Sequence, residues 1–456
     1  MERLGRQLVT TPPRPTRIIQ FGEGNFLRAF VDWLVDCGVA IVQPLPTGQV
    51  GALEAQDRLY TVLLEGIQDG KPVREHRVID VVNQTVNPYT DWDAFLALAH
   101  NADTTVIVSN TTEAGIAIDP ADAAGTVPPR GFPAKLAYLL AQRFQVGLPG
   151  FLILPCELID DSGPRLKQCV LQCVRDFNLG DDLAAWIDTE NTFCSTLVDR
   201  IVSGYPAGQA DALCQEFGYD DALIVKAEPF ISWVIEGTPT QLARLPLPAF
   251  AVTMTDNLRP YRDRKVYLLN GPHTTMAQLA RLAGFSTVGD VMSDPAWRAF
   301  IEAEMCDEIS PVIDLPQPEL ALFATQTIER FDNPTLHHSL DAIALNSVSK
   351  FTARLLPIIK ANLAAGRPLP QRIALALAGL LAIYGRLVHD AAHPIDSPDI
   401  IDAFQHTEDD YVATVLANEA LWGEDLTKLD DLTQTVTTFL ATITTSGVRA
   451  AIGSLS

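Results

Sequence analysis

The chain has 456 residues, of which 47% are hydrophobic and 20% are charged. This composition is typical of a globular protein large enough to form two hydrophobic cores. The formal net charge of −23 argues against non-specific binding to nucleic acid and against attraction to anionic membrane surfaces.

The first predicted elements are a strand, a glycine turn and a helix. Arg17–Phe21 is a short run rich in β-branched residues, Gly22 and Gly24 follow it, and apolar residues from Phe26 onward recur with helical spacing. Two glycines allow the backbone to approach a pyrophosphate, and the N-terminus of a helix supplies amide donors to it. The third glycine of the usual dinucleotide-binding pattern is Leu27 here, so an ordinary glycine turn remains the alternative.

A second buried strand is expected at Tyr60–Glu65, and it ends in a carboxylate. In a dinucleotide-binding fold, an acidic residue at the end of the second strand hydrogen-bonds the adenosine ribose and repels a 2′-phosphate. Glu65 therefore favours NAD over NADP, and Asp69 in the next turn is the alternative residue for this role.

Two further strands are each followed by polar residues. Thr104–Ser109 precedes Asn110, Thr111, Thr112 and Glu113, and Phe151–Leu154 is followed closely by Glu157. The carboxyl ends of parallel strands line the crevice in which open α/β sheets bind their ligands. We therefore expect these residues at a ligand site.

The run from Lys265 to His273, KVYLLNGPH, combines an amine, a carboxamide and an imidazole. These groups can release a proton and donate hydrogen bonds to a carbonyl oxygen as negative charge develops on it. In a helix, Asn270 and His273 would lie on adjoining positions of one face, although scattered surface side chains are the alternative explanation. Pro272 predicts a distorted or interrupted helix between Asn270 and His273.

The predicted secondary structure of the chain changes near residue 256. Before it, strands and helices alternate, which predicts an α/β domain at residues 1–256 with a Rossmann-type, mainly parallel sheet that Glu228–Val234 extends. After it, helical spacing dominates, for example at Lys265–Ala283 and Val348–Asn362, so residues 257–456 are expected to form an all-α catalytic and substrate-binding domain.

Six ordered motifs resemble the long-chain polyol-specific (mannitol) dehydrogenase family, and within it the tagaturonate reductase (altronate oxidoreductase) branch. The motifs are FGEGNFLRAF at 21–30, SNTTEAGI at 109–116, LPCELIDDSG at 154–163, TLVDRIVSGYP at 196–206, KVYLLNGPHT at 265–274 and ALNSVSKFTARLLP at 344–357.

The resemblance implies roles for individual residues. The glycine turn of the family reads GxGxFxR, which this chain satisfies. By this likeness Lys265 is the general acid in reduction and the general base in oxidation, while Asn270 and His273 polarise the carbonyl oxygen. The expected cofactor-binding residues are Gly22, Gly24, Asn25, Phe26, Arg28, Glu65, Asn110, Thr111, Thr112 and Glu113.

The substrate is expected to carry a carboxylate. Leu158 stands where the mannitol-oxidising branch has an Asn, which favours the uronate-reducing branch, and Glu157 is expected at the substrate. A carboxylate needs a cationic partner when it leaves water. The candidate partners are Arg262, Arg264, Lys350 and Arg354. Lys350 and Arg354 are favoured because hydrogen-bonding residues surround them in NSVSKFTAR.

Taken together, these features predict a cytoplasmic oxidoreductase that moves a hydride between NAD(H) and a small sugar acid, most simply reducing tagaturonate to altronate. The alternatives are a fructuronate or mannitol dehydrogenase of the same family and a non-catalytic NAD-binding sensor. Seven cysteines without a compact framework suit a reducing compartment, no metal is expected, and the oligomeric state is not readable.

Overall fold

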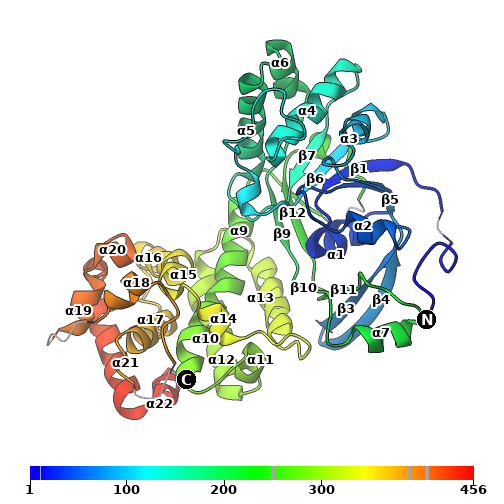
Figure 1. The fold of residues 1–456 in the computed structure, drawn as a ribbon. Helices are drawn as coiled ribbons and strands as arrows, with labels where there is room; N and C mark the ends of the chain where they lie inside the picture. The colour runs from blue at the N-terminus through cyan, green and yellow to red at the C-terminus, as the bar shows by residue number, and fades with distance from the viewer. Residues whose placement is uncertain (11, 248–251, 389–391, 406–409, 456) are drawn as a thin grey trace. The chain divides into compact units, whose positions relative to one another are not determined.

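The computed structural model describes residues 1–10, 12–247, 252–388, 392–405 and 410–455 (Figure 1). The chain forms two compact units. Unit 1 comprises Met1–Glu65 and Pro72–Leu258, and unit 2 comprises Arg259–Ser456 together with the short segment Gly66–Lys71.

Unit 1 contains a six-stranded parallel sheet with the order β5-β2-β1-β6-β7-β8. Its strands are β1 (Thr16–Phe21), β2 (Gly38–Val42), β5 (Val82–Val86), β6 (Val106–Ser109), β7 (Leu152–Pro155) and β8 (Thr192–Phe193). This is the doubly wound order, in which the direction of winding reverses between the two central strands, here β1 and β6. The predicted Rossmann-type sheet is confirmed.

Alternation along the strands sends neighbouring side chains to opposite faces of this sheet, so that Ile18 and Ile19 enter different cores. Helices cover the Ile19 face, as Figure 1 shows. They are α3 (Trp92–Ala97), α4 (Phe132–Gln145), α5 (Ser162–Asp176) and α6 (Asp181–Glu190). The Ile18 face packs against α1 (Asn25–Leu34) and against residues of two smaller sheets.

Unit 1 also contains two smaller sheets, and they include two segments that were predicted to belong to the parallel sheet. One has the order β10-β11-β3-β4, and the other has the order β13-β12-β9. Their strands are β3 (Tyr60–Gln68), β4 (Lys71–Ile79), β9 (Thr196–Asp199), β10 (Val202–Gly204), β11 (Val225–Ala227), β12 (Ser232–Glu236) and β13 (Thr253–Thr255). Neither Tyr60–Glu65 nor Glu228–Val234 therefore joins the parallel sheet as predicted, because a buried apolar run does not specify which strand it pairs with.

Short helices complete unit 1. They are α2 (Val50–Glu54), η1 (Leu98–His100), η2 (Glu113–Gly115), α7 (Ala210–Phe217) and α8 (Pro239–Leu242).

The described part of unit 2 after Arg259 is helical, as predicted. Its elements are α9 (Arg259–Lys265), η4 (Val266–Asn270), α10 (Gly271–Leu282), α11 (Val288–Met292), α12 (Pro295–Ala303), η5 (Glu304–Ile309), η6 (Ser310–Val312), α13 (Gln317–Phe331), α14 (Leu340–Ala344), α15 (Ser347–Arg354), α16 (Leu356–Ala364), α17 (Gln371–Tyr384), α18 (Pro398–Asp402), α19 (Tyr411–Leu416), α20 (Glu419–Trp422), η7 (Leu426–Lys428), α21 (Leu432–Ser446) and α22 (Val448–Gly453). The single helix expected at Val348–Asn362 is divided at Leu355, because Pro357 in the first turn of α16 has no amide to continue a helix.

Helix α17 forms the centre of unit 2. Every residue from Ile373 to Tyr384 is buried, and the helix packs against α10 and α21. A helix that is apolar on all sides belongs in a core. Among the described residues, none of the helices combines the length and the apolar character needed to cross a bilayer.

One ionisable group in this core has an unusual environment. Glu304 is fully buried, and its Oε1 accepts a hydrogen bond of 2.5 Å from Thr275 Oγ1 on α10. Its Oε2 has no hydrogen-bond partner among the described residues. Burial, reinforced by the nearby Glu308 carboxylate, raises the pKa of Glu304 to about 8.

We predict that Glu304→Gln becomes more stable relative to the wild type as the pH rises. Between pH 4.5, the ordinary pKa of the group, and about 8, the folded chain binds more protons at this site than the unfolded chain. Wild-type stability therefore declines across this window by an amount on the order of a few kcal/mol, whereas an amide does not titrate. Urea unfolding at several pH values measures the difference. Glu302→Gln, at an exposed neighbouring position, should follow the wild type, and a pH-independent difference for Glu304→Gln would contradict this account.

Candidate functional site

The last residues of four parallel strands lie level at one edge of the large sheet. Phe21 of β1 pairs with Val42 of β2 and with Ser109 of β6, and Ser109 pairs with Pro155 of β7. The residues that follow these strand ends are Gly22, Gln43, Asn110 and Cys156. The structure therefore brings the predicted glycine turn and the predicted polar loop to the edge where this fold binds ligands.

The glycine turn has the geometry that a bound pyrophosphate requires. Gly22 has φ +122°, and a Cβ there would lie 3.0 Å from the carbonyl oxygen of Asn110, so both the conformation and the close approach require glycine. Gly24 precedes the first turn of α1, and a Cβ at this position would meet nothing within 4 Å. The space beside Gly24 at the start of α1 is therefore open, which leaves room for a phosphate group next to the helix N-terminus.

Arg28 holds this turn in place from inside the unit. Its side chain is buried, with donors to the carbonyl oxygens of Glu23 and Leu223 and to the side chains of Asn25 (2.7 Å) and Gln49 (3.1 Å). Four of the five guanidinium hydrogens are used in this way. Arg28 therefore positions the glycine turn and the loops next to it.

The other two predicted residues of the turn anchor α1. Phe26 stacks on Phe30 with a centroid distance of 4.9 Å. Asn25 lies against Gly204 of β10, where a Cβ would come within 2.8 Å of Asn25 Nδ2. The orientation of the first helical turn is thus fixed by contacts on both sides.

The loop after β6 is shaped by Glu157. This buried carboxylate accepts hydrogen bonds from Ser109 Oγ at 3.0 Å, from the backbone amide of Thr111 at 2.9 Å and from Thr111 Oγ1 at 3.0 Å. Asn110 Nδ2 donates to the carbonyl oxygen of Cys156 at 2.8 Å. Both oxygens of Glu157 therefore serve the loop, which makes it a positioning residue of this edge.

The loop continues through Thr112, whose φ is +100°, into the turn that begins at Glu113. The side chain of Glu113 lies outside the described part of the structure. Leu158, directly after Glu157, is 59% exposed.

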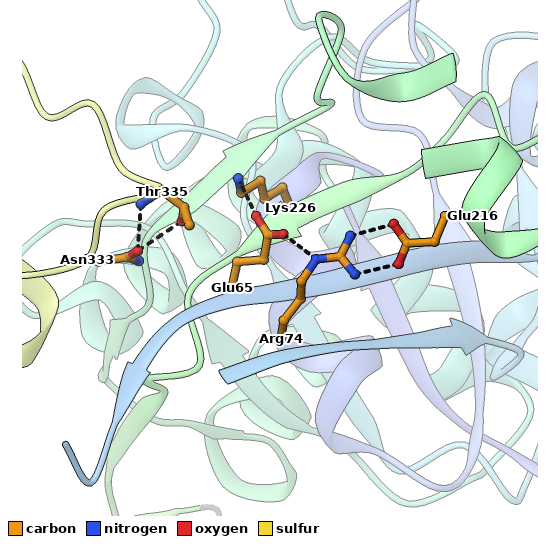
Figure 2. Close-up of polar contacts among 6 residues, drawn as sticks. All are labelled: Glu65, Arg74, Glu216, Lys226, Asn333 and Thr335. Carbon is orange, nitrogen blue, oxygen red and sulfur yellow. Dashed lines mark hydrogen bonds and ion pairs between the residues drawn. The ribbon is translucent and has the colours of Figure 1, made fainter. Parts of the chain in front are cut away.

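Glu65 is not at this edge of the sheet. Figure 2 shows its carboxylate between Lys226 of β11, at 2.5 Å, and Arg74 of β4, at 2.8 Å, while Arg74 also binds Glu216 of α7. The second strand of the parallel sheet is β2, so the prediction that Glu65 ends this strand is wrong. The alternative, Asp69, lies in the β3–β4 turn, where its backbone amide donates to Glu329 of α13.

In unit 2, the run that contains Lys265 and Asn270 forms a π-helical turn, η4, between α9 and α10. Five residues along a regular α-helix would rotate these side chains about 140° apart. In a π turn the hydrogen bond spans five residues, here from the amide of Gly271 to the carbonyl of Val266, so residues five apart return to the same side. The π turn thus brings Lys265 and Asn270 nearer to one side of the helix than a regular α-helical turn would.

The distortion expected from Pro272 exists but lies earlier than predicted. Helix α10 is regular from Gly271 onward, with Pro272 in its first turn, and the irregular turn ends at Asn270. The ring of a proline interferes with the carbonyl four residues before it, here that of Leu268, so the preceding turn has to adapt.

His273 is buried on α10, and its Nε2 has no hydrogen-bond partner among the described side chains. Its ring lies 4.5 Å from the ring of Phe331 and 4.6 Å from that of His338. Burial holds the pKa of His273 well below its usual value, and His338, Arg330, Arg354 and Lys350 act in the same direction. His273 is therefore neutral at physiological pH.

The two favoured cations lie on α15, beside this helix. Arg354 Nη1 donates to Thr274 Oγ1 at 3.2 Å and to the carbonyl oxygen of Asn270 at 3.5 Å. Lys350 Nζ donates to the carbonyl oxygen of Ile343 at 2.7 Å, which uses one of its three hydrogens. Arg264, by contrast, is paired with Glu319 and stacked on Phe323. The structure thus groups Asn270, His273, Lys350 and Arg354 on neighbouring helices.

Sequence reasoning missed two residues of this cluster, Arg330 and His338. Arg330 is buried at the end of α13, and the loop that carries His338 is ordered by Asn333, whose Oδ1 accepts from the amide and hydroxyl of Thr335 (Figure 2). No local pattern in the sequence connects His338 with a helix 65 residues earlier. Within the described residues, no group of His, Cys, Asp or Glu side chains is arranged to hold a metal ion.

Two curated relatives resemble the chain over its whole length. The altronate oxidoreductase of Yersinia enterocolitica is 41% identical over 484 residues, which cover 100% of both chains. That of Klebsiella pneumoniae is 40% identical over 479 residues and 99% of each chain.

Solved structures of low sequence identity share the fold. Pseudomonas fluorescens mannitol 2-dehydrogenase, in a ternary complex with NAD and D-mannitol, gives a TM-score of 0.70 at 23% identity over 99% of each chain. A D-sorbitol dehydrogenase in substrate-free form gives 0.81 at 21% identity over 99% of this chain and 100% of its own. Residues 16–249 match the mannitol dehydrogenase Rossmann domain, and residues 257–444 match the mannitol dehydrogenase C-terminal domain. The chain belongs to the mannitol dehydrogenase family.

Proposed function

We propose that this chain is an NAD-dependent tagaturonate reductase, which interconverts tagaturonate and altronate. The observation that carries the proposal is the group of cations around a neutral buried His273, because a uronate needs both a polarised carbonyl and a partner for its carboxylate. Full-length similarity to altronate oxidoreductases at 40–41% identity supports it.

The glycine turn of unit 1 binds the dinucleotide in this proposal. Gly22 allows the close approach, the N-terminus of α1 receives the pyrophosphate in the open space beside Gly24, and Glu157 holds the Asn110–Thr112 loop at the same edge. The nicotinamide ring supplies or accepts the hydride when it is bound.

The residues of unit 2 carry the proton chemistry. Lys265 donates a proton to the substrate oxygen during reduction and removes it during oxidation. The carboxamide of Asn270 donates a hydrogen bond to the same oxygen. His273 is neutral, and the tautomer with a proton on its unpartnered Nε2 gives that oxygen a second donor without adding a charge.

Lys350 and Arg354 bind the carboxylate of the substrate. Both have donors beyond those used within the chain, and their half-buried positions strengthen a charge-assisted hydrogen bond. Seven cysteines, all of them described as free thiols, support a reducing compartment such as the cytoplasm for this enzyme.

The second candidate is a dehydrogenase of the same family that acts on fructuronate or on a neutral polyol such as mannitol. Leu158 argues against mannitol, because an exposed leucine offers no hydrogen bond where the mannitol-oxidising branch has an asparagine. A non-catalytic NAD-binding sensor is a different class, and the presence of Lys265, Asn270 and His273 together argues against it.

We predict NADH oxidation with tagaturonate and much slower oxidation with fructose, because fructose has no carboxylate for the cations to bind. Absorbance of NADH, followed with tagaturonate, fructuronate and fructose in parallel, measures the preference. Faster turnover of fructose would instead indicate a polyol dehydrogenase of the same family. No turnover of any of the three substrates would favour a non-catalytic NAD-binding sensor.

Lys265→Met is expected to lower kcat by about a thousandfold or more, because both general acid–base transfer and a fixed donor are lost. Its Kd for NADH should change little. Stopped-flow and fluorescence titration measure the two quantities. Lys360→Met is the matched control, since Lys360 is an exposed lysine of unit 2 that pairs with Glu424. Undiminished turnover by Lys265→Met would end the proposed mechanism.

Lys350→Met is expected to raise KM for tagaturonate by about 10- to 100-fold, which corresponds to one charge-assisted hydrogen bond. The KM for fructose should stay the same. Steady-state kinetics with both substrates separate loss of carboxylate binding from general damage, again with Lys360→Met as control. An unchanged KM for tagaturonate would remove Lys350 from the substrate site.

A further inference from the structure

No acidic residue directly follows the strand that ends at the expected ribose position. In this fold, the adenosine ribose binds at the carboxyl end of the second strand, next to the glycine turn. That strand is β2, and it pairs with β1 so that Val42 lies level with Phe21. The segment after it, residues 43–50, reads QPLPTGQV and contains no ionisable side chain.

The polar side chain that begins this segment is used to shape the segment itself. Gln43 is buried, and its Nε2 donates to the carbonyl oxygens of Leu45 at 2.9 Å and Pro46 at 3.3 Å. Its Oε1 accepts from the amide of Val50 at 3.4 Å. Gln43 therefore stabilises the loop after β2. Any negative charge next to this loop has to come from a residue outside the segment 43–50.

The carboxylate of Glu23, in the glycine turn, lies against the loop after β2. Glu23, between Gly22 and Gly24, accepts a hydrogen bond at its Oε1 from the amide of Gln49 at 3.2 Å. Gly48 packs against the same atom, since a Cβ at Gly48 would lie 2.0 Å from Glu23 Oε1 and 2.7 Å from Gln43 Oε1. The carboxylate of Glu23 is thus held between the turn and the loop after β2.

We propose that Glu23 is the residue that selects NAD(H) over NADP(H). It supplies from the glycine turn the negative charge that the fold usually carries at the end of its second strand, and this charge disfavours a 2′-phosphate on the ribose. Its Oε1 is engaged by Gln49, and its Oε2 is the acceptor for a ribose hydroxyl. The inference rests on the proposed use of a nicotinamide dinucleotide and is independent of the sugar substrate.

Fluorescence titration with NADH and with NADPH, without any sugar, tests this assignment. The wild type should bind NADH more tightly than NADPH, and Glu23→Gln should reduce the ratio of the two affinities by about tenfold or more, because a like-charge contact is removed. Glu23→Asp keeps the charge and should keep the preference, which distinguishes selectivity from damage to the turn. Glu65→Gln, which changes the carboxylate that sequence alone favoured, should leave the ratio at the wild-type value.

An unchanged ratio in Glu23→Gln, or a changed ratio in Glu65→Gln, would overturn the assignment of Glu23 while leaving the proposed reductase intact. A wild type that binds both dinucleotides equally would also overturn it. A wild type that binds neither would overturn the assignment and the proposed function together.

Discussion

The hydrogen-bond register of the parallel sheet is the constraint on which the proposed cofactor site depends. Because β1, β2, β6 and β7 run parallel and end level with one another, residues from four distant parts of the sequence meet at one edge. A shift of one residue in any pair would move a side chain to the opposite face and separate the glycine turn from the Asn110 loop. The buried carboxylate of Glu157 and the buried guanidinium of Arg28 then fix the two loops that the register has brought together.

In unit 2 the corresponding constraint is the irregular start of α10. The ring of Pro272 interferes with a regular preceding turn, and the π turn found there brings Lys265 and Asn270 nearer to one side of the helix than a regular α-helical turn would. Burial of the next turn then gives His273 a neutral ring amid cations. Backbone geometry and electrostatics therefore both act on the short segment that we propose for the acid–base chemistry.

Several buried polar groups in this chain support the proposed sites through hydrogen bonds to loops of the chain itself. Arg28 and Glu157 spend their hydrogen bonds on backbone groups of loops, whose amides and carbonyls would otherwise lack partners. Arg28 and Glu157 are conspicuous in the sequence motifs, and the hydrogen bonds that the structure shows for them order these loops. Glu304, buried beside Thr275, shows that a strongly raised pKa can also occur in a helical core, so a perturbed pKa alone does not identify a catalytic residue.

The sequence by itself determined a mainly parallel sheet in the first half, the helical second half, the glycine turn and the short spacing of Lys265, Asn270 and His273, because strand and helix periodicity, turn chemistry and short spacing are local properties. Tertiary structure alone decided which strands share a sheet. Tyr60–Glu65 and Gly38–Val42 are both short buried runs, and only strand pairing makes β2 the neighbour of β1. For this reason the acidic residue that we propose near the adenosine ribose is Glu23 and not Glu65. Tertiary structure also brought His338 and Arg330 to His273, since contacts between residues more than fifty positions apart arise from packing and leave no pattern in the sequence.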